Sequence, residues 1–416
     1  MRFPADQKRA RDRHSGPRPF FWSSPANASH DDSSGKRAGP DRIEPLRFAQ
    51  LVLVTVTTLL TTGMAATPSG AGNIPTTARS GSAEHRVVRT HQVMGTRMVM
   101  TIEATDRVSA LAASETAYQA VAEADRRLST WTASSELSQI NAAPVGEPVK
   151  VSARLSRDLR AALRCARETN GAFTPGLGGL VEAWGLREGG RRPSLGEIQS
   201  AVSGASLENV RLEDDLVTRL APGFLFEEGA FGKGAGLDDA LERLGSTAAS
   251  AAVIDLGGQI AVWGQTSVSV EIAHPRDRNR VILRLEVSRG SVATSGSSER
   301  GVVIDGEHLG HVLDPRTGLP SGDFGSVTVW AEDATRADCL STALYVFGPE
   351  AAHAWAARGS ELGVVTVAFQ GNQLLATATP DLRGRLVPVT DEVVIQWIGS
   401  EFGEPARASS PYPQVP

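Results

Sequence analysis

Four segments of the chain alternate apolar and polar side chains, which is the pattern of a strand that buries one face. They are residues 97–103, 267–272, 281–287 and 326–330. Residues 107–128 and 152–168 instead carry apolar side chains at helical spacing, and the second stretch ends at Asn170 and Gly171. Because the strands come in runs rather than in strict alternation with helices, the order predicts an α+β fold.

A body at residues 85–402 is expected, because the composition on either side of it differs. Residues 1–47 are rich in Arg, Pro, Ser, Gly and Asp without apolar periodicity, which predicts a disordered leader or a start assigned too far upstream. Residues 67–84 have the composition of a flexible linker, and residues 403–416 that of a disordered tail.

A stretch without charged side chains runs from Phe48 through Ala78. Within it, an apolar run at residues 51–60 follows Arg47 and precedes small residues. This order is typical of a secretory signal, whereas a spanning helix needs about 20 apolar residues. We therefore expect residues 48–66 to be a signal peptide or membrane anchor of an exported protein, periplasmic or associated with the inner membrane. The alternative, a buried strand, would be unusual between two disordered arms.

Charge and cysteine content exclude some functions. The net charge of −5 and the pI near 6.0 argue against a nucleic-acid-binding protein, which usually carries a basic face. Cys165 and Cys339 are too few for a disulfide framework and lack metal-site spacing. We interpret them as small buried hydrophobic side chains rather than as a redox pair.

Residues 335–349 end in Gly-Pro, which predicts a helix terminus, and carry the first candidate site. Asp338 and Thr342 are four residues apart, so their oxygens lie on one face of a helix. A carboxylate with a hydroxyl suits a hard cation such as Mg²⁺, whose other ligands are waters and phosphate oxygens. In the structural alternative, Thr335 caps the helix and forms a capping box with Asp338.

A glycine-rich stretch at residues 226–238 holds Lys233. Only four of the 42 basic residues are lysine, so a lysine here is an unusual choice. Glycines let backbone N–H groups approach an anion, and a lysine adds a point charge suited to a phosphate. No Ser or Thr follows the lysine, so this is not a P-loop. The alternative is an ordinary glycine-rich turn with a solvated lysine.

His311 precedes an Asp-Pro-Arg-Thr-Gly turn at residues 314–318. A histidine can serve as general base, because its unperturbed pKa of about 6.5 lies near the working pH. A lone histidine is more often structural, so the turn by itself indicates only a chain reversal. Glycine-bearing strand ends at residues 255–258 and 293–296 are of the kind that line ligand clefts.

Taken in order, these segments resemble one family, the ApbE-type FAD:protein FMN transferases. The resemblance spans roughly residues 88–370 and is carried by residues 93–96, 128–131, 135–141, 171–175, 184–185, the Lys233 loop, 255–258, 293–296, 311–318 and 337–342. It implies a single α+β, T-fold-like domain that binds Mg²⁺ and takes FAD as substrate. Family members transfer FMN onto a threonine hydroxyl of a partner protein and release AMP.

The resemblance also implies roles for single residues. Asp338 and Thr342 match the family's metal ligands, with the Ala230 carbonyl and Ser341 contributing. His311 matches the histidine that deprotonates the incoming threonine. Eight residues match FAD-contacting positions: Met94, Trp131, Ala172, Phe173, Thr174, Glu227, Lys233 and Val312.

Three positions depart from the family pattern. Thr174 stands where members commonly have Asp, Glu228 where they have Leu, and Ala235 where an aromatic residue is frequent. Two other functions therefore stay open: an FAD pyrophosphatase that yields FMN and AMP, and a periplasmic FAD-binding protein without catalysis. An FAD-dependent oxidoreductase is disfavoured, because no Gly-x-Gly-x-x-Gly opens a βαβ unit.

Overall fold

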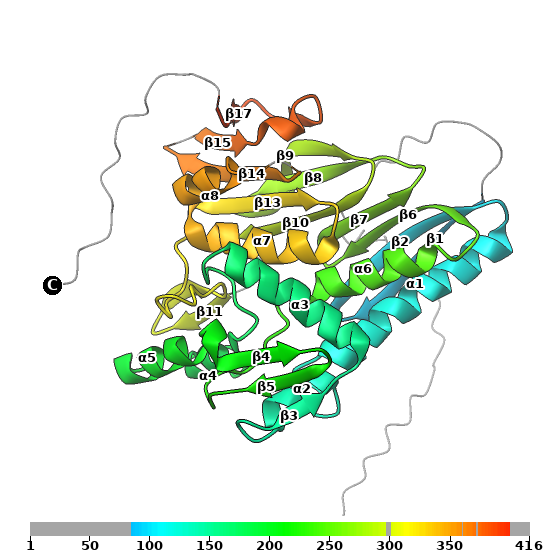
Figure 1. Cartoon of the computed structure of the whole chain (residues 1–416). Helices are drawn as coiled ribbons and strands as arrows, with labels where there is room; N and C mark the ends of the chain where they lie inside the picture. The colour runs from blue at the N-terminus through cyan, green and yellow to red at the C-terminus, as the bar shows by residue number, and fades with distance from the viewer. Residues whose placement is uncertain (1–84, 297–300, 360, 372, 400–416) are drawn as a thin grey trace, which may run out of the picture. The chain divides into compact units, whose positions relative to one another are not determined.

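The computed structural model describes residues 85–296, 301–359, 361–371 and 373–399 (Figure 1). The leader, the apolar segment at 48–66, the linker and the tail expected from the sequence lie outside these residues. Within the described part, no helix is long and apolar enough to cross a membrane.

A nine-stranded sheet forms the centre of the fold. Neighbouring strands are antiparallel except for β15 and β17, which are parallel. The order is β1 (His85–Val93), β2 (Thr96–Ala104), β6 (Ala249–Leu256), β7 (Gln259–Gly264), β10 (Gly290–Gly296), β13 (Gly325–Ala331), β14 (Gly363–Gln370), β15 (Gln373–Ala378) and β17 (Val393–Trp397).

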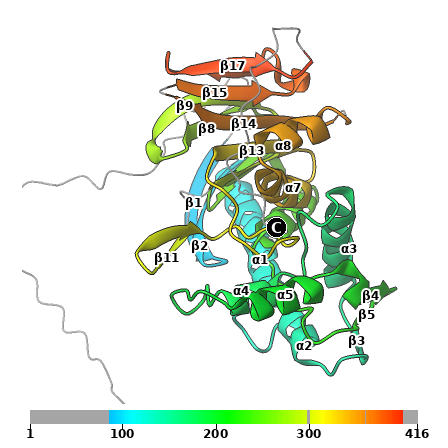
Figure 2. The same ribbon diagram turned by 90° about the vertical axis from the view of Figure 1, so that its left-hand side faces the viewer.

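Three helices cover one face of this sheet, as Figures 1 and 2 show: α1 (Arg107–Leu128), α6 (Gly232–Leu244) and α7 (Ala334–Phe347). The opposite face packs against a second sheet of β8 (Val268–His274), β9 (Asp277–Val287) and β16 (Leu386–Pro388). On β14, Val364 belongs to the core under α7, and Val365 to the core under the second sheet. Alternate residues of one strand therefore fill two different cores.

The remaining elements surround the helical face. A three-stranded sheet has the order β3-β5-β4, and β11 pairs with β12. The elements are α2 (Glu136–Ala142), β3 (Pro148–Lys150), α3 (Ala153–Glu168), α4 (Gly178–Ala183), α5 (Leu195–Gly204), β4 (Val210–Glu213), β5 (Leu216–Arg219), β11 (Gly301–Ile304), β12 (Glu307–Gly310) and α8 (Pro349–Ala356), with single 3-10 turns at Leu207–Asn209 and Pro380–Leu382.

The α+β prediction is confirmed, and all four predicted strands occur. The helix predicted at 107–128 has these bounds in the structure, and the one at 152–168 begins one residue later, because Ser152 is its N-cap. The prediction that Thr335 caps the helix that ends before Gly348 is wrong. Asp333 is the N-cap residue of α7, and Thr335 lies inside the helix.

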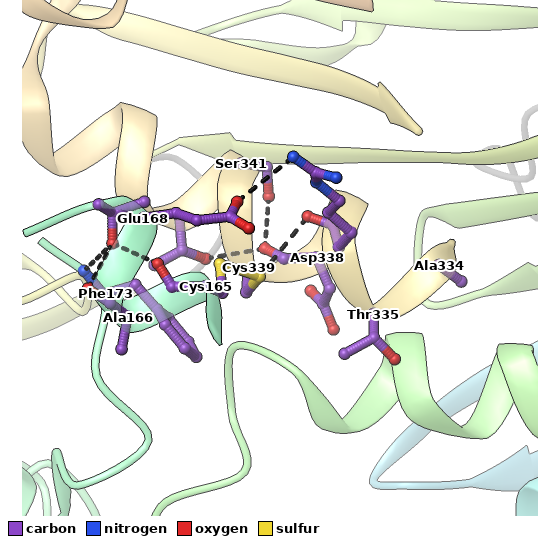
Figure 3. The surroundings of a disulfide bond; sticks show 12 residues. Cys165, Ala166, Glu168, Phe173, Ala334, Thr335, Asp338, Cys339 and Ser341 are labelled. Atoms are coloured by element: carbon purple, nitrogen blue, oxygen red, sulfur yellow. Dashed lines mark hydrogen bonds and ion pairs between the residues drawn. A yellow bond between two sulfur atoms is a disulfide. The ribbon is translucent and has the colours of Figure 1, made fainter. Parts of the chain in front are cut away.

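The two cysteines form a disulfide that links α3 to α7 (Figure 3). Both are buried, as the sequence suggested, but the interpretation as two separate hydrophobic side chains is wrong. The pairing could not be predicted, because Cys165 and Cys339 are 174 residues apart and only the packing of the two helices brings them together.

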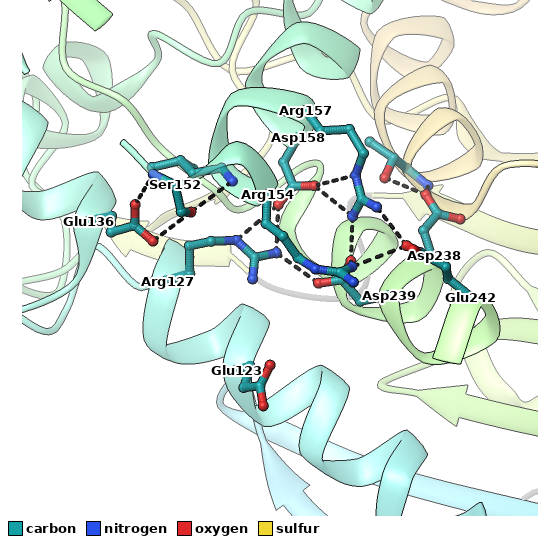
Figure 4. Close-up of polar contacts among 12 residues, drawn as sticks. Glu123, Arg127, Glu136, Ser152, Arg154, Arg157, Asp158, Asp238, Asp239 and Glu242 are labelled. Carbon is teal, nitrogen blue, oxygen red and sulfur yellow. Dashed lines mark hydrogen bonds and ion pairs between the residues drawn. The ribbon is translucent and has the colours of Figure 1, made fainter. Parts of the chain in front are cut away.

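A buried ion-pair network joins α1, α3 and α6 (Figure 4). The Arg127 guanidinium lies 2.6 Å from Asp158 and 2.9 Å from Asp239. Arg154 and Arg157 complete the network at Asp239. Burial acts to raise the pKa of Asp239, but its arginine partners outweigh this effect and hold that pKa below its usual value. The charges therefore pair across three helices rather than lying alone in the core.

Candidate functional site

The first turns of α6 and α7 are in backbone contact at Gly234. A Cβ atom at this position would lie 2.4 Å from the Cα of Thr335 and 2.5 Å from the carbonyl oxygen of Ala334. Such distances are far below van der Waals contact, so only glycine allows the two helices to come this close. The glycine-rich sequence around Lys233 is therefore needed for packing as well as for any anion contact.

This approach places Lys233 against Asp338. The Lys233 Nζ lies 3.0 Å from Oδ1 of Asp338, and the Gly234 backbone N–H donates to Oδ2 at 3.0 Å. Asp338 is only 4% exposed. A buried carboxylate thus sits at the N-terminus of α6, where the helix dipole favours negative charge. The structure does not contain the capping box of the structural alternative, because the Asp338 carboxylate bonds to α6.

The start of α7 is capped by a residue of α6 instead of by its own N-cap side chain. The Asp238 carboxylate accepts hydrogen bonds from the backbone N–H groups of Ala334 and Thr335, at 2.7 and 2.9 Å, and from the Thr335 hydroxyl at 2.6 Å. Burial raises the pKa of Asp238, while these hydrogen bonds oppose the rise. Asp238 therefore fixes the turn that precedes Asp338.

Three hydroxyl groups form a cluster at the backbone carbonyl of Asp338, one turn along α7. The Ser341 hydroxyl donates to the Asp338 carbonyl oxygen at 2.9 Å. Ser295, at the end of β10, lies 2.9 Å from the Ser341 hydroxyl and 3.4 Å from the Thr342 hydroxyl. Of the four predicted metal ligands, Asp338, Ser341 and Thr342 thus lie on adjacent turns of α7, with both hydroxyls at the Asp338 backbone carbonyl rather than at its carboxylate. The sequence did not identify Ser295 as part of this hydroxyl cluster, although residues 293–296 were recognised as a strand end of the kind that lines ligand clefts.

The donors around Asp338 fit a hard cation. They are oxygens from one carboxylate and from hydroxyls, and Mg²⁺ is usually held by one or two carboxylates together with waters and phosphates. No group of three His, Cys, Asp or Glu side chains with metal-binding geometry occurs among the residues that the structure describes. The fourth predicted ligand, Ala230, lies in the turn just before α6, half-buried.

Met94 lies over the second turn of α6. It occupies the β1–β2 turn with a φ of 52°, a left-handed conformation that is uncommon for a non-glycine residue. Its backbone N–H donates to Asp125 at 3.0 Å, which fixes this turn against α1. Its Cε atom lies 3.1 Å from where a Cβ of Gly236 would be. Met94, Ala230 and Val312 all pack against the same core cluster.

A second polar cluster surrounds Trp131, whose side chain is 70% exposed. The Arg187 guanidinium lies 4.6 Å from the centre of its ring and forms an ion pair with Glu227. The Thr130 hydroxyl donates to Glu228 at 2.5 Å. Burial, reinforced by the charge of Glu228, raises the pKa of Glu227 to about 7 despite Arg187. Arg187 and Thr130 belong to this polar cluster, and the sequence did not identify either as a site residue.

The run at residues 172–174 uses its side chains within the protein. Ala172 and Phe173 are buried in the core cluster. The Thr174 hydroxyl donates to the Ala205 carbonyl at 3.2 Å and accepts from the Gly176 N–H at 3.1 Å. Thr174 thus serves as a turn-stabilising residue.

His311 and Val312 lie half-buried between β12 and the Asp314 turn. The Val312 carbonyl accepts from the Ser321 N–H at 2.8 Å, and the Asp314 carbonyl from the Gly318 N–H at 2.7 Å. The predicted turn at 314–318 is therefore confirmed. Its Gly318 carbonyl accepts a hydrogen bond from the Trp184 indole N–H at 2.7 Å, which anchors the turn to α4.

Comparison with known proteins identifies relatives of the whole region. A family model, described as ApbE family, matches residues 94–366. An FAD:protein FMN transferase of Klebsiella pneumoniae (strain 342) is 28% identical over 276 residues, 63% of this chain and 79% of that protein. An FAD:protein FMN transferase of Treponema pallidum (strain Nichols) is 29% identical over 262 residues, 58% of this chain and 72% of that protein.

The fold is similar to a crystal structure as well. The ApbE protein of Thermotoga maritima matches with a TM-score of 0.63 and 28% identity, over 68% of this chain and 94% of that one. The family match begins at Met94 and ends within β14, so it includes every residue discussed above as part of the site. It also covers more than half of the 416 residues. The chain therefore belongs to the ApbE family.

Proposed function

We propose that this chain transfers FMN from FAD to a threonine hydroxyl of an exported or membrane-bound acceptor protein, with Mg²⁺ held at Asp338, and releases AMP. The observation that carries the proposal is the contact between Lys233 and Asp338 at the N-terminus of α6. The contact places Lys233, whose ammonium group is suited to a phosphate, beside Asp338, whose carboxylate is suited to a metal ion. Both residues lie in a member of the ApbE family. The two relatives described above bear the name FAD:protein FMN transferase, which supports the same activity.

In the proposed reaction, the threonine oxygen attacks the phosphorus of the FMN half of FAD. A new P–O bond forms, the pyrophosphate P–O bond breaks, and AMP leaves with the bridging oxygen. Such a transfer needs positive charge and hydrogen-bond donors around the phosphoryl group, and an activated hydroxyl in line with the leaving group. A bound Mg²⁺ would neutralise charge on the phosphate oxygens.

Lys233 and Asp338 have to change partners for this chemistry. In the structure, one carboxylate oxygen is held by the Lys233 Nζ and the other by the Gly234 N–H. Lys233 is 30% exposed, so its Nζ has room to turn from the carboxylate to a pyrophosphate oxygen. The Gly234 hydrogen bond keeps Asp338 oriented while the other oxygen becomes available to a cation.

His311 takes the threonine proton in this proposal. It lies in a turn that is fixed by hydrogen bonds to Val312 and Asp314 rather than in a loose loop. A neutral imidazole can accept a proton, so a histidine is suited to the role of general base. Met94 and the cluster around Trp131 are proposed to hold the flavin half of FAD.

AMP release from FAD with Mg²⁺, measured with and without a threonine-bearing acceptor, tests the proposal. Mass spectrometry of the acceptor should show a gain of one FMN, and the gain should be lost in Asp338→Ala and His311→Ala. AMP without a labelled acceptor would instead identify an FAD pyrophosphatase. A folded protein that binds FAD but releases no AMP would identify a binding protein.

We also propose that the chain is exported through residues 48–66. The support is the uncharged stretch from Phe48 through Ala78 with its short apolar run. N-terminal sequencing of the protein recovered from the periplasmic fraction tests this: cleavage near residue 66 is expected for a signal peptide. An intact segment in the membrane fraction would indicate an anchor, and protein only in the cytoplasm would contradict export.

A further inference from the structure

The disulfide lies next to the proposed cation ligand. Cys339 directly follows Asp338 on α7, and its partner Cys165 lies in the last turn of α3 (Figure 3). The turn of α7 that carries Asp338 is thus held from two sides. Gly234 and Asp238 of α6 bond to it on one side, and α3 is covalently attached to it on the other.

The disulfide is the strong link on the α3 side. Among the described residues, the polar side-chain link between α3 and this turn is the ion pair of Arg336 with Glu168, at 3.3 Å. Both of its side chains are more than 40% exposed, and such pairs stabilise little. Without the disulfide, the first turns of α7 would keep their attachment to α6 and the apolar packing they share with α3 in one core cluster, and they would lose the covalent restraint from α3.

We infer that the Cys165–Cys339 disulfide positions Asp338 for cation binding, so that its reduction weakens the cation site while the domain stays folded. The inference rests on the proposed function, in which Asp338 is the carboxylate ligand. Small displacements are sufficient for such an effect, because Mg²⁺ demands near-ideal octahedral geometry with short ligand distances. The cysteines are positioning residues, since neither is proposed to touch the cation or FAD.

A small reductant would have to reach the disulfide through a cavity, because both cysteines are almost fully buried. A cavity of about 330 Å³ is lined by both cysteines and by Arg164, Glu168 and Thr335 among others. It contains none of the predicted site residues. In the reduction, a dithiol supplies two electrons and two protons: the S–S bond breaks, each cysteine becomes a thiol, and the dithiol closes into its own disulfide. FAD has no part in this step.

Mn²⁺ binding to the full chain, followed by electron paramagnetic resonance without FAD, tests the inference. We expect the oxidised protein to bind Mn²⁺ in a manner that Asp338→Ala abolishes. The dithiothreitol-reduced protein and the double variant Cys165→Ser, Cys339→Ser should bind it at least fivefold more weakly, and reoxidation of the wild type should restore the affinity. Thiol counting confirms each redox state, and circular dichroism confirms that each sample is folded.

Two controls separate positioning from general loosening. Glu168→Gln breaks the ion pair between the same two helices and should leave Mn²⁺ affinity unchanged. FAD affinity, measured by flavin fluorescence without metal, should change less than twofold on reduction. A loss of FAD and Mn²⁺ binding together would overturn the inference, because it would indicate a disordered domain.

The remaining outcomes are equally decisive. Equal Mn²⁺ affinity in folded oxidised and reduced protein would overturn the inference and leave the proposed function intact. If the oxidised wild type shows no Asp338-dependent Mn²⁺ binding, the assignment of Asp338 as cation ligand fails, and the inference fails with it. FMN transfer measured on the same samples then shows whether the proposed activity survives without that assignment.

Discussion

The surroundings of Glu227 act on its pKa in opposite directions. Burial and the charge of Glu228 raise its pKa to about 7, while Arg187 favours the ionised form. Near neutral pH, the Arg187 and Trp131 side chains are thus coupled to a group that changes its charge. This is a property of the folded protein alone, because Arg187 and Glu227 are 40 residues apart in the chain.

We therefore predict that FAD affinity changes with pH near pH 7, where Glu227 gains or loses its proton. At pH 6 the carboxyl group is mostly neutral and no longer places a negative charge beside the negatively charged FAD molecule, so FAD should bind several-fold more tightly at pH 6 than at pH 8. Glu227→Gln mimics the neutral form and should remove this step. The dissociation constant, measured from flavin fluorescence at both pH values, checks the prediction, which fails if the variant keeps the wild-type pH dependence.

The proposed role of Lys233 at the phosphate can be tested by a single substitution. Lys233→Met should lower kcat/KM for AMP release by about 10²-fold or more, since one preorganised charge at a transferring group is typically worth that much. Lys150→Met, at an exposed strand end, is the matched control and should have little effect. Comparable rates in the two variants would contradict a role for Lys233 at the phosphate.

Single residues differ in how well the sequence reveals them. Lys233 was found because lysine is rare in this chain, and Asp338 because its spacing from Thr342 is helical. Ser295, Arg187 and Asp238 were missed, because their partners lie 40 to 97 residues away in the sequence. Local patterns identify a functional group, whereas its neighbours depend on tertiary packing.

Helix packing leads to a prediction about Gly234. Gly234→Ala places a methyl group against the backbone of Thr335, which cannot move aside without separating α6 from α7. We expect the free energy of unfolding to fall by about 3 kcal/mol or more, as for severe overpacking. Gly196→Ala in α5 meets no atom within 4 Å and should be neutral or stabilise by about 0.5–1 kcal/mol.

Urea unfolding of the two alanine variants makes the comparison direct. The same chemical change, one methyl group added to a helical glycine, should lower the free energy of unfolding at Gly234 and not at Gly196. A Gly234→Ala variant as stable as the wild type would show that the approach of α6 and α7 is looser than the structure indicates.

The ion-pair network makes a prediction about three helices at once. Arg127→Met removes the buried arginine that pairs with both Asp158 and Asp239 and leaves these carboxylates to the partly exposed Arg154 and Arg157. Breaking such a network typically costs up to about 3–5 kcal/mol. Arg192→Met removes an exposed arginine that pairs with Glu307 and should cost less than about 1 kcal/mol. Thermal or urea unfolding distinguishes the two, and a small effect at Arg127 would contradict a stabilising network.

Whole helices were predicted better than their ends. The 22 residues of α1 were found because its small apolar side chains recur at helical spacing. The start of α7 was assigned to the wrong capping residue, because the cap comes from Asp238 on a different helix. A cap supplied from a distance leaves no local pattern.

At the scale of the whole molecule, the sequence predicted the class of fold but not the order of the strands. β8 and β9 follow β7 in the chain, yet they leave the central sheet and form the second one, while β10 returns to pair with β7. Alternation of apolar residues is the same in both sheets, so it indicates strands without assigning them to a sheet.

The predicted domain boundaries can be tested directly. A chain of residues 85–402 should fold cooperatively and bind FAD within twofold of the full chain's affinity. The reason is that the described core clusters close within residues 85–399. Calorimetry and flavin fluorescence on both chains provide the measurement. A truncated protein that aggregates or loses FAD would show that residues outside this range belong to the domain.

The attachment of α7 to Asp238 has a consequence for changing the protein by design. Residues 233–238 and 334–342 behave as one exchangeable part, because the first segment caps, contacts and orients the second. A chimaera that takes only one of the two segments from a relative would pair two helix ends whose capping and packing contacts do not match. Changes to the proposed cation site should therefore begin with both segments transplanted together.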